Sequence, residues 1–145
     1  MTAEAASLPV EDKLEILELY ARHHLTEDAL DFEGTAATYT SDGAMESPMG
    51  VLRGRDELVG FFEKYRALFV GKRHLSFHHV ITATADGARG ESVFLLLEVA
   101  TVPQLLGSGW SKDTLRKVDG RWRFVHRTFG FDAGMGKAPP LQPAG

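Results

Sequence analysis

The sequence predicts a single α+β domain in which the helices come first and an antiparallel sheet follows. Three segments with helical spacing lie before Gly71, whereas the chain after it alternates between apolar and polar residues as strands do. The pairs Asp86-Gly87 and Asp119-Gly120 are typical of tight hairpin turns. Strands joined by such turns pair antiparallel, so the helices are expected to pack together on one face of the sheet.

The helices are predicted from about Val10 to Leu25, from Asp31 to Tyr39 and from Arg55 to Phe69, with a turn at Ser41-Asp42-Gly43. In the first helix, apolar residues recur at three- and four-residue steps, which is the period of a buried helical face. The inward stripe is expected to consist of Val10, Leu14, Leu17, Ala21 and His24.

The strands are predicted from period-two alternation and from the turn residues that separate them. A short pair is expected within Ala44–Leu52, folded at Pro48-Met49-Gly50, and four longer strands follow. Those longer strands are expected at Arg73–Thr84, Arg89–Val102, Trp110–Val118 and Arg121–Phe131. We therefore expect a domain over residues 10–132, an N-terminal extension over 1–9 and a Pro/Gly-rich tail over 133–145.

Composition excludes several functional classes. A net charge of −4 and a pI near 5.8 argue against a nucleic-acid partner, which needs a concentrated basic face. The absence of cysteine excludes disulfides and thiolate chemistry. We expect no signal peptide in residues 1–10 and no membrane partner, because the apolar run Val93–Leu97 is too short to span a bilayer. A cytoplasmic location is expected.

Two polar residues fall on faces that are otherwise apolar. Asp28 continues the stripe of the first helix four residues beyond His24, and His74 lies on one face of the first long strand. A long helix laid across the sheet would bring Asp28 against His74. A carboxylate that orients an imidazole gives a base whose pKa can be tuned to neutrality, although an inward Asp or His is more often structural.

A metal site is not expected. His74 and His78 share one strand face, but their backbones would stand roughly 13 Å apart at about 3.3 Å per residue, a spacing that does not suit one ion. His78 and His79 point to opposite faces of the strand. We therefore expect neither a metal nor any other cofactor.

Four stretches carry a resemblance to a known family over about Val10 to Phe131. They are Leu19-Tyr20-Ala21-Arg22 leading to Asp28, Tyr39-Thr40-Ser41-Asp42-Gly43, Arg73 to His78, and Gly109 to Asp113 together with Asp119 to Arg123. In this order the sequence resembles the SnoaL-like group of the nuclear-transport-factor-like superfamily. That resemblance implies a cone: a curved antiparallel or mixed sheet and three N-terminal helices that enclose a hydrophobic cavity.

Within that group the sequence is similar to the lyase branch that includes scytalone dehydratase, bile-acid dehydratase and a dehydrochlorinase; polyketide cyclases are also similar. The resemblance implies that Asp28 matches the family's dyad aspartate and His74 its histidine base. A Tyr or Lys of the lyases is replaced by His23, whereas helical geometry places His24 beside Asp28, so either histidine could face the cavity. His78 stands where the family tends to have Asn.

The expected function is that of a cofactor-independent lyase, isomerase or cyclase acting on a hydrophobic polycyclic or polyketide-like small molecule. His24 or His23, His78 and Tyr39 would hold a substrate oxygen, with His126 a further candidate, and Tyr65 and Trp110 would contribute to the cavity wall. The other expected wall residues are Leu17, Tyr20, Phe32, Phe61, Phe62, Phe94, Leu96, Trp122 and Phe124.

Two other functions remain open. A non-catalytic ligand-binding or assembly domain would show Asp28 too far from His74 for a hydrogen bond, or a cavity closed by side chains. An epoxide hydrolase would need a second inward carboxylate, for which Glu98 and Asp113 are the strand candidates. Leu75, Phe77 and Ile81 are expected on the outer sheet face, where they would support a homodimer or homotrimer.

Overall fold

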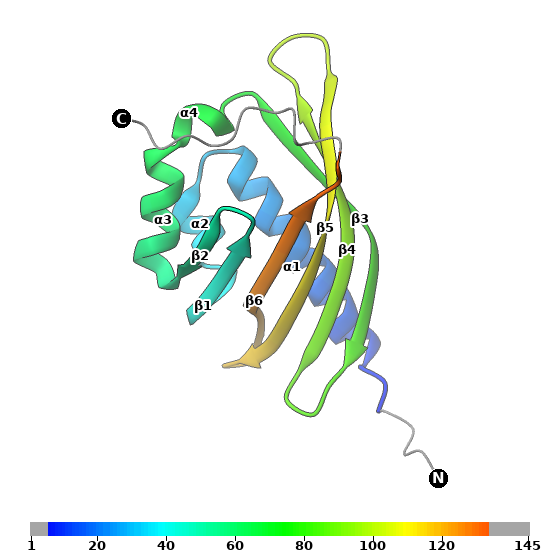
Figure 1. Cartoon of the computed structure of the whole chain (residues 1–145). Coiled ribbons are helices and arrows are strands. Elements are labelled where there is room, and N and C mark those ends of the chain that lie inside the picture. Colours follow the sequence, from blue (N-terminus) through cyan, green and yellow to red (C-terminus); the bar gives the residue numbers. More distant parts are fainter. Residues whose placement is uncertain (1–5, 134–145) are drawn as a thin grey trace.

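The protein is a curved six-stranded sheet with its helices on one side, seen in a computed structural model that describes residues 6–133 (Figure 1). The sheet order is β2-β1-β6-β5-β4-β3. The helices are α1 (Val10–Asp28), α2 (Phe32–Ala36), α3 (Gly54–Lys64) and α4 (Arg66–Phe69), and the strands are β1 (Tyr39–Ser47), β2 (Gly50–Arg53), β3 (Lys72–Ala83), β4 (Ala88–Glu98), β5 (Gln104–Val118) and β6 (Arg121–Phe131). The predicted α+β class is confirmed.

The sheet is mixed rather than purely antiparallel. The neighbours β3, β4, β5 and β6 pair antiparallel through hairpins, and β1 joins β6 in parallel. At Asp119-Gly120 both residues have positive φ, 50° and 75°, as the predicted two-residue turn requires. The expected tail begins where the described residues end, so residues 134–145 lie outside them.

The first helix is longer than predicted and presents a different face to the sheet. It continues through Asp28, and its buried residues are Ile16, Leu19, Tyr20, His23 and Glu27. The predicted stripe was wrong: Val10, Leu14 and Leu17 are 67%, 56% and 39% exposed. Both stripes have helical period, and packing against β3 and β6 selects the one that carries the large aromatic Tyr20.

Two other predictions failed at local backbone features. Ser41-Asp42-Gly43 is not a turn but part of β1, where the register against β6 shifts between Tyr39 and Ala44. The third predicted helix is two helices, because Tyr65 leaves the helical region with φ −108° and ψ 21°. The second is only five residues long, capped by the Asp31 side chain, which accepts a hydrogen bond from the backbone N–H of Gly34.

A β-bulge in β3 reverses the alternation that the sequence suggested. Two residues, His78 and His79, stand opposite one residue of β4, and His78 has φ 55°. His79 therefore turns inward, onto the ring of Tyr20 at 4.6 Å, and His78 is exposed. The same shift brings Ile81 onto the core, which corrects the prediction that it lies on the outer face.

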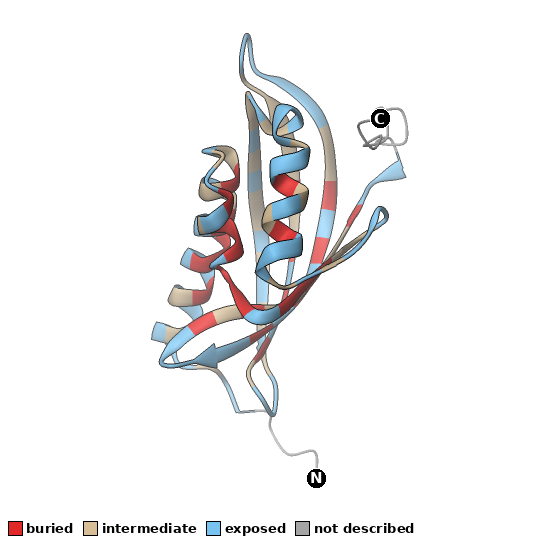
Figure 2. Ribbon diagram, turned by 90° about the vertical axis from the view of Figure 1, so that its left-hand side faces the viewer, coloured by how far each residue is buried: buried red, intermediate tan, exposed pale blue. Residues whose placement is uncertain are grey.

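The hydrophobic core lies between α1, α2, α3 and the concave face of the sheet (Figure 2). Its largest fully buried side chains include Tyr20, Phe32, Phe62 and Phe124. Among the described residues, no helix is long and apolar enough to cross a membrane.

Candidate active site

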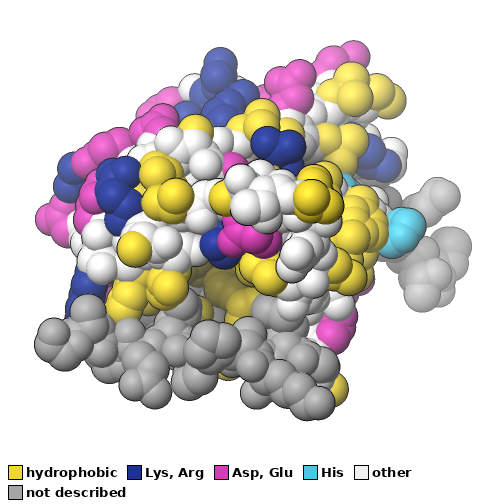
Figure 3. All heavy atoms as spheres, turned by 90° about the horizontal axis from the view of Figure 1, so that it is seen from above, with side chains coloured by type: hydrophobic (Ala, Val, Ile, Leu, Met, Phe, Trp, Pro, Cys, Tyr) yellow, Lys and Arg dark blue, Asp and Glu magenta, His cyan; other side chains and the backbone are white. Residues whose placement is uncertain are grey.

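A cavity of about 750 Å³ opens between the helices and the sheet. Hydrophobic side chains surround its hollow in the view from above (Figure 3). Its apolar wall comes from every layer of the fold and includes Met45, Met49, Phe61, Phe62, Leu68, Phe69, Phe94, Leu96, Phe129 and Phe131. Its polar lining consists of His23, His24, Glu27, Tyr39, Lys72, His74, Ser111, Arg127 and Asp132. The cavity is thus largely apolar with a few polar groups, as small-molecule sites are.

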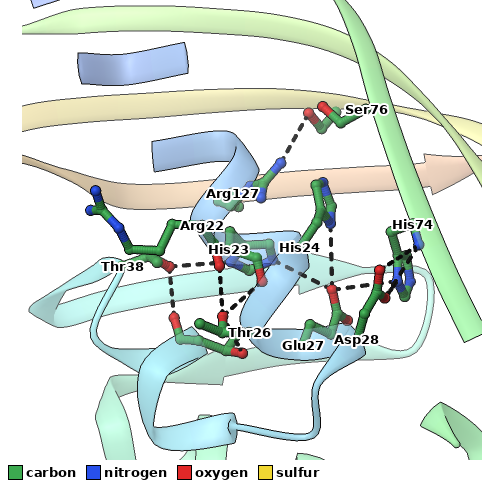
Figure 4. Close-up of polar contacts among 12 residues, drawn as sticks. Arg22, His23, His24, Thr26, Glu27, Asp28, Thr38, His74, Ser76 and Arg127 are labelled. Carbon is green, nitrogen blue, oxygen red and sulfur yellow. Dashed lines mark hydrogen bonds and ion pairs between the residues drawn. The ribbon is translucent and has the colours of Figure 1, made fainter. Parts of the chain in front are cut away.

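Asp28 and His74 meet at the C-terminal end of α1 (Figure 4). The Nδ1 atom of His74 lies 2.7 Å from the Asp28 Oδ1 atom, and the backbone N–H of His74 donates to both carboxylate oxygens, at 3.2 and 3.0 Å. Both side chains are 15% exposed. The three contacts fix the imidazole against the helix end, with Nδ1–H as the donor to Asp28 and His74 lining the cavity.

Glu27 is the site residue that the sequence interpretation missed. Its Oε2 atom lies 3.5 Å from His24 Nδ1, 3.8 Å from His74 Nδ1 and 3.9 Å from His23 Nε2. A sequence pattern could have identified Glu27, since it follows His23 by four residues and so continues the helix face of Ile16 and Tyr20. Because the wrong stripe was chosen, this carboxylate was assigned no role.

Both His23 and His24 line the cavity, so the choice between them does not arise. The Nδ1 atom of His23 lies 3.2 Å from the Thr38 hydroxyl, and its Nε2 faces Glu27. The ring of His24 stacks on that of His74, with centroids 5.5 Å apart and planes 11° from parallel. The Nδ1 atom of His24 is buried and has no hydrogen-bond partner among the described residues.

The charges in this cluster are unevenly distributed. Burial alone would raise the pKa of Glu27, but the neighbouring imidazoles, His74 first, hold it well below its usual range. Burial would lower the pKa of His74, yet the carboxylates of Glu27 and then Asp28 outweigh it and raise that pKa. Burial lowers the pKa of His23 and of His24. The carboxylates thus make His74 the most basic imidazole of the three, whereas burial disfavours the charged forms of His23 and His24.

A second polar cluster contributes two residues to the cavity wall. Arg127 is paired with Asp113, Nε to Oδ1 at 2.9 Å, and its guanidinium carbon lies 4.3 Å from the Phe124 ring centroid. Tyr20 and Ser111 donate hydroxyl hydrogen bonds to the same carboxylate at 2.6 and 2.9 Å. Asp113 is fully enclosed by these groups, and only Arg127 and Ser111 of the set reach the cavity.

The remaining predicted residues divide between the cavity and other places. Tyr39 lines the cavity, and its buried hydroxyl has no partner among the described residues. His78 is exposed on the bulge, Trp110 faces the outer side of β5, and Tyr65 packs on Phe61 outside the lining. His126 pairs instead with Glu46, Nε2 to Oε2 at 2.8 Å. Among the wall residues, Tyr20, Phe32, Trp122 and Phe124 belong to the packed core, and Leu17 is 39% exposed.

Comparison with known proteins identifies the family of this chain. The family model of the SnoaL-like domain matches residues 9–128. The chain belongs to this SnoaL-like family. No protein of curated function matches the sequence of this SnoaL-like protein.

Solved structures share the fold of this SnoaL-like protein. A cystatin-like-fold protein of unknown function from Nostoc punctiforme is 34% identical with a TM-score of 0.82, over 94% of this chain and 100% of that one. A protein of unknown function from Mycobacterium tuberculosis is 35% identical with a TM-score of 0.76, over 86% and 76%. A scytalone dehydratase-like protein from Novosphingobium aromaticivorans, at 22% identity and a TM-score of 0.73 over 86% and 89%, shares the fold alone.

Proposed function

We propose that this SnoaL-like protein is an acid/base enzyme, a lyase, isomerase or cyclase, that removes a carbon-bound proton from a hydrophobic small molecule. His74 is the base in this proposal, and Asp28 positions it. The observation that carries the proposal is the 2.7 Å contact between His74 Nδ1 and Asp28 Oδ1 at the wall of a 750 Å³ cavity. The family includes polyketide cyclases and dehydratases, which supports chemistry of this class.

The geometry supports a defined role for each partner. With the Nδ1 proton held by Asp28, Nε2 is the nitrogen left to accept a proton from a bound molecule. The backbone N–H of His74 donates to the same carboxylate, which leaves Asp28 little freedom to rotate. Because the carboxylates raise the pKa of His74, its neutral imidazole is a stronger base than a free histidine.

The lining of the cavity supports an amphipathic substrate, with an apolar body and at least one oxygen. The aromatic and aliphatic wall suits a polycyclic or polyketide-like skeleton. Burial raises the pKa of Tyr39 well above its usual range, so its unpartnered hydroxyl keeps the proton and can donate it in a hydrogen bond to a substrate oxygen. An enolate formed next to a ketone would be stabilised by such a donor.

The two alternative functions receive less support. A domain that only binds a ligand was expected to show a long Asp28–His74 distance or a cavity filled by side chains. The observed distance between His74 Nδ1 and Asp28 Oδ1 is 2.7 Å, and the cavity is open. For an epoxide hydrolase, Asp113 is enclosed by Arg127 and Tyr20, and Glu98 is paired with Lys72 at 2.7 Å. Neither strand carboxylate is placed to activate a water in the cavity.

The proposal is tested by proton exchange, which needs no knowledge of the leaving group. Fused-ring ketones such as 1-tetralone and a 3-ketosteroid are incubated with the protein in D₂O, and deuterium entry next to the carbonyl is followed by NMR. We expect the protein to catalyse exchange, and we expect His74→Gln and Asp28→Asn to slow it by about 100-fold or more, since general base catalysis is usually worth that much.

The control is His126→Gln, which removes a histidine paired with a carboxylate outside the cavity. It should exchange deuterium at the wild-type rate. Circular dichroism of all three variants checks that they fold. Exchange at an unchanged rate in folded His74→Gln protein would overturn the role of His74, and the loss of exchange in the control would overturn the assignment of the site.

A further inference from the structure

Three side chains of α1 converge on one point at the cavity wall. The imidazoles of His23 and His24 and the carboxylate of Glu27 offer ligand atoms that all lie within 4.8 Å of one another. They come from positions i, i+1 and i+4 of a single helix (Figure 4). All three line the cavity. Their side chains are only 6%, 13% and 10% exposed.

The spacing within this cluster is not that of hydrogen bonds. Good N–H···O bonds are about 2.7–3.2 Å long. The Glu27 Oε2 atom instead stands 3.5 Å from His24 Nδ1 and 3.9 Å from His23 Nε2. Ligand atoms held at about 2.1 Å from a tetrahedral ion stand roughly 3.4 Å apart, so the two distances to Glu27 lie near that spacing. All three ligand atoms lie within 4.8 Å of one another and would move somewhat closer around an ion.

A second observation points to a ligand at the same place. The Nδ1 atom of His24 is buried and has no hydrogen-bond partner among the described residues, although it is directed at Glu27. Buried polar atoms are nearly always paired, so an unpaired one next to a carboxylate calls for a partner. The second nitrogen of His23 meets the Thr38 hydroxyl at 3.2 Å, the outer hydrogen bond that fixes metal-binding histidines.

We propose that His23, His24 and Glu27 form a binding site for a divalent transition-metal ion, zinc in the first place. Two imidazoles and one carboxylate are a ligand set of catalytic zinc sites, which keep a fourth position open. All three residues line the cavity, so an ion held by them would be within reach of an oxygen of a bound molecule. His74 stays outside the shell, because its Nδ1 atom is engaged by Asp28 at 2.7 Å.

The site goes beyond the proposed function and does not depend on it. These three ligands lie on α1, whereas His74 and His78, whose spacing does not suit one ion, lie on β3. Metal binding at α1 would supply an electrophile beside the His74 base. The two proposals are tested separately: the metal site by metal titration, and the acid/base function by deuterium exchange.

The test uses the full chain without an affinity tag, freed of metal by a chelator and dialysed. Zn²⁺ is titrated by calorimetry, and Co²⁺ is titrated by visible absorption, whose intense bands report four-coordinate cobalt. We expect one equivalent of each metal to bind. Glu27→Gln and His24→Phe, which keep the size of the side chain, should each weaken Zn²⁺ binding at least tenfold and abolish the cobalt bands.

The matched control is the histidine–carboxylate pair His126 and Glu46, which lies outside the cavity. His126→Phe should leave both titrations unchanged. The proposal is overturned if the wild-type protein binds less than one equivalent, or if folded Glu27→Gln and His24→Phe bind zinc as tightly as it does. Loss of binding in His126→Phe would likewise assign the metal to the surface pair and overturn the α1 site.

Discussion

At the scale of single residues, the most consequential charges outside the dyad are those of Asp113 and Arg127. The Asp113 side chain is fully buried, and it accepts bonds from Arg127, Tyr20 and Ser111. Removing one member of such a pair leaves an uncompensated buried charge. We therefore expect Asp113→Ala to lower the free energy of unfolding by about 3–5 kcal/mol, as measured by urea denaturation.

The control for this prediction is Glu33→Ala, which breaks the ion pair with Arg55 on the surface. Both of those side chains are 59% exposed, so water replaces the lost partner and the stability should change little. Equal losses in the two variants would contradict the idea that burial makes the Asp113 pair indispensable.

A second prediction at this scale concerns acid stability. Burial lowers the pKa of His79, the electrostatic influence of His24 and Arg127 lowers it further, and Asp113 opposes them. Near pH 6.5 the unfolded chain therefore binds a proton at this histidine more readily than the folded chain does. The free energy of unfolding consequently falls as the pH drops below that value. His79→Gln should lose less stability between pH 7 and pH 5 than the wild type, in urea denaturation at each pH. Identical losses would rule out this contribution.

The contact between Asp28 and His74 was predictable, but its surroundings were not. Asp28 and His74 were found because polar residues on apolar faces are costly and because the family resemblance pairs them. Glu27 was overlooked because α1 offers two helical stripes, and periodicity alone does not say which one meets the sheet. The partners of Arg127 depend on β5 and β6 pairing Asp113 with Arg127, which no local pattern reveals.

At the scale of elements, the bulge in β3 decides which histidines face inward. His78 takes φ 55°, a conformation that costs residues with a Cβ roughly 1–2 kcal/mol and that glycine adopts freely. We expect His78→Gly to raise the free energy of unfolding by up to about 1 kcal/mol, after the greater chain entropy of glycine is subtracted. Denaturation by urea measures this change.

The neighbouring residue provides the contrast. His79→Gly removes a ring that packs on Tyr20 at 4.6 Å and contacts the Ser76 hydroxyl at 2.6 Å, so it should destabilise the protein. A loss of stability in both variants would mean that the His78 side chain contributes more than its backbone costs. No local pattern predicts the bulge, because both regular and bulged strands are compatible with alternating residues.

At the scale of the whole molecule, the order of the elements followed from periodicity and turn chemistry. Asp86-Gly87 and Asp119-Gly120 mark the hairpins, and the chain from Lys72 to Phe131 forms strands and their connections, as predicted. The parallel contact of β1 with β6 could not be inferred from local sequence, because it joins segments about 80 residues apart. The cavity also escaped prediction in detail, since cavity and core have the same apolar residues.

The curved sheet leaves one face without helices, and its register gathers apolar side chains there. Leu75 pairs with Leu95, and Phe77 pairs with Val93, which pairs in turn with Trp110. Since Phe94, Leu96 and Ser111 line the cavity, these alternating neighbours point to the opposite, outer face. Leu75 and Trp110 are 41% and 38% exposed, and a contiguous apolar patch of this kind marks an interface.

We propose that two or three copies of the chain associate through this outer patch and form a closed symmetric assembly. Light scattering coupled to size exclusion should give a dimer or trimer for the wild type and a monomer for the double variant Leu75→Glu/Trp110→Glu. Leu14→Glu, on the exposed face of α1, is the control and should keep the assembly. A monomeric wild type, or an assembly that survives the double substitution in folded protein, would refute the interface. Because the cavity opens on the other side of the sheet, deuterium exchange should persist in the monomer.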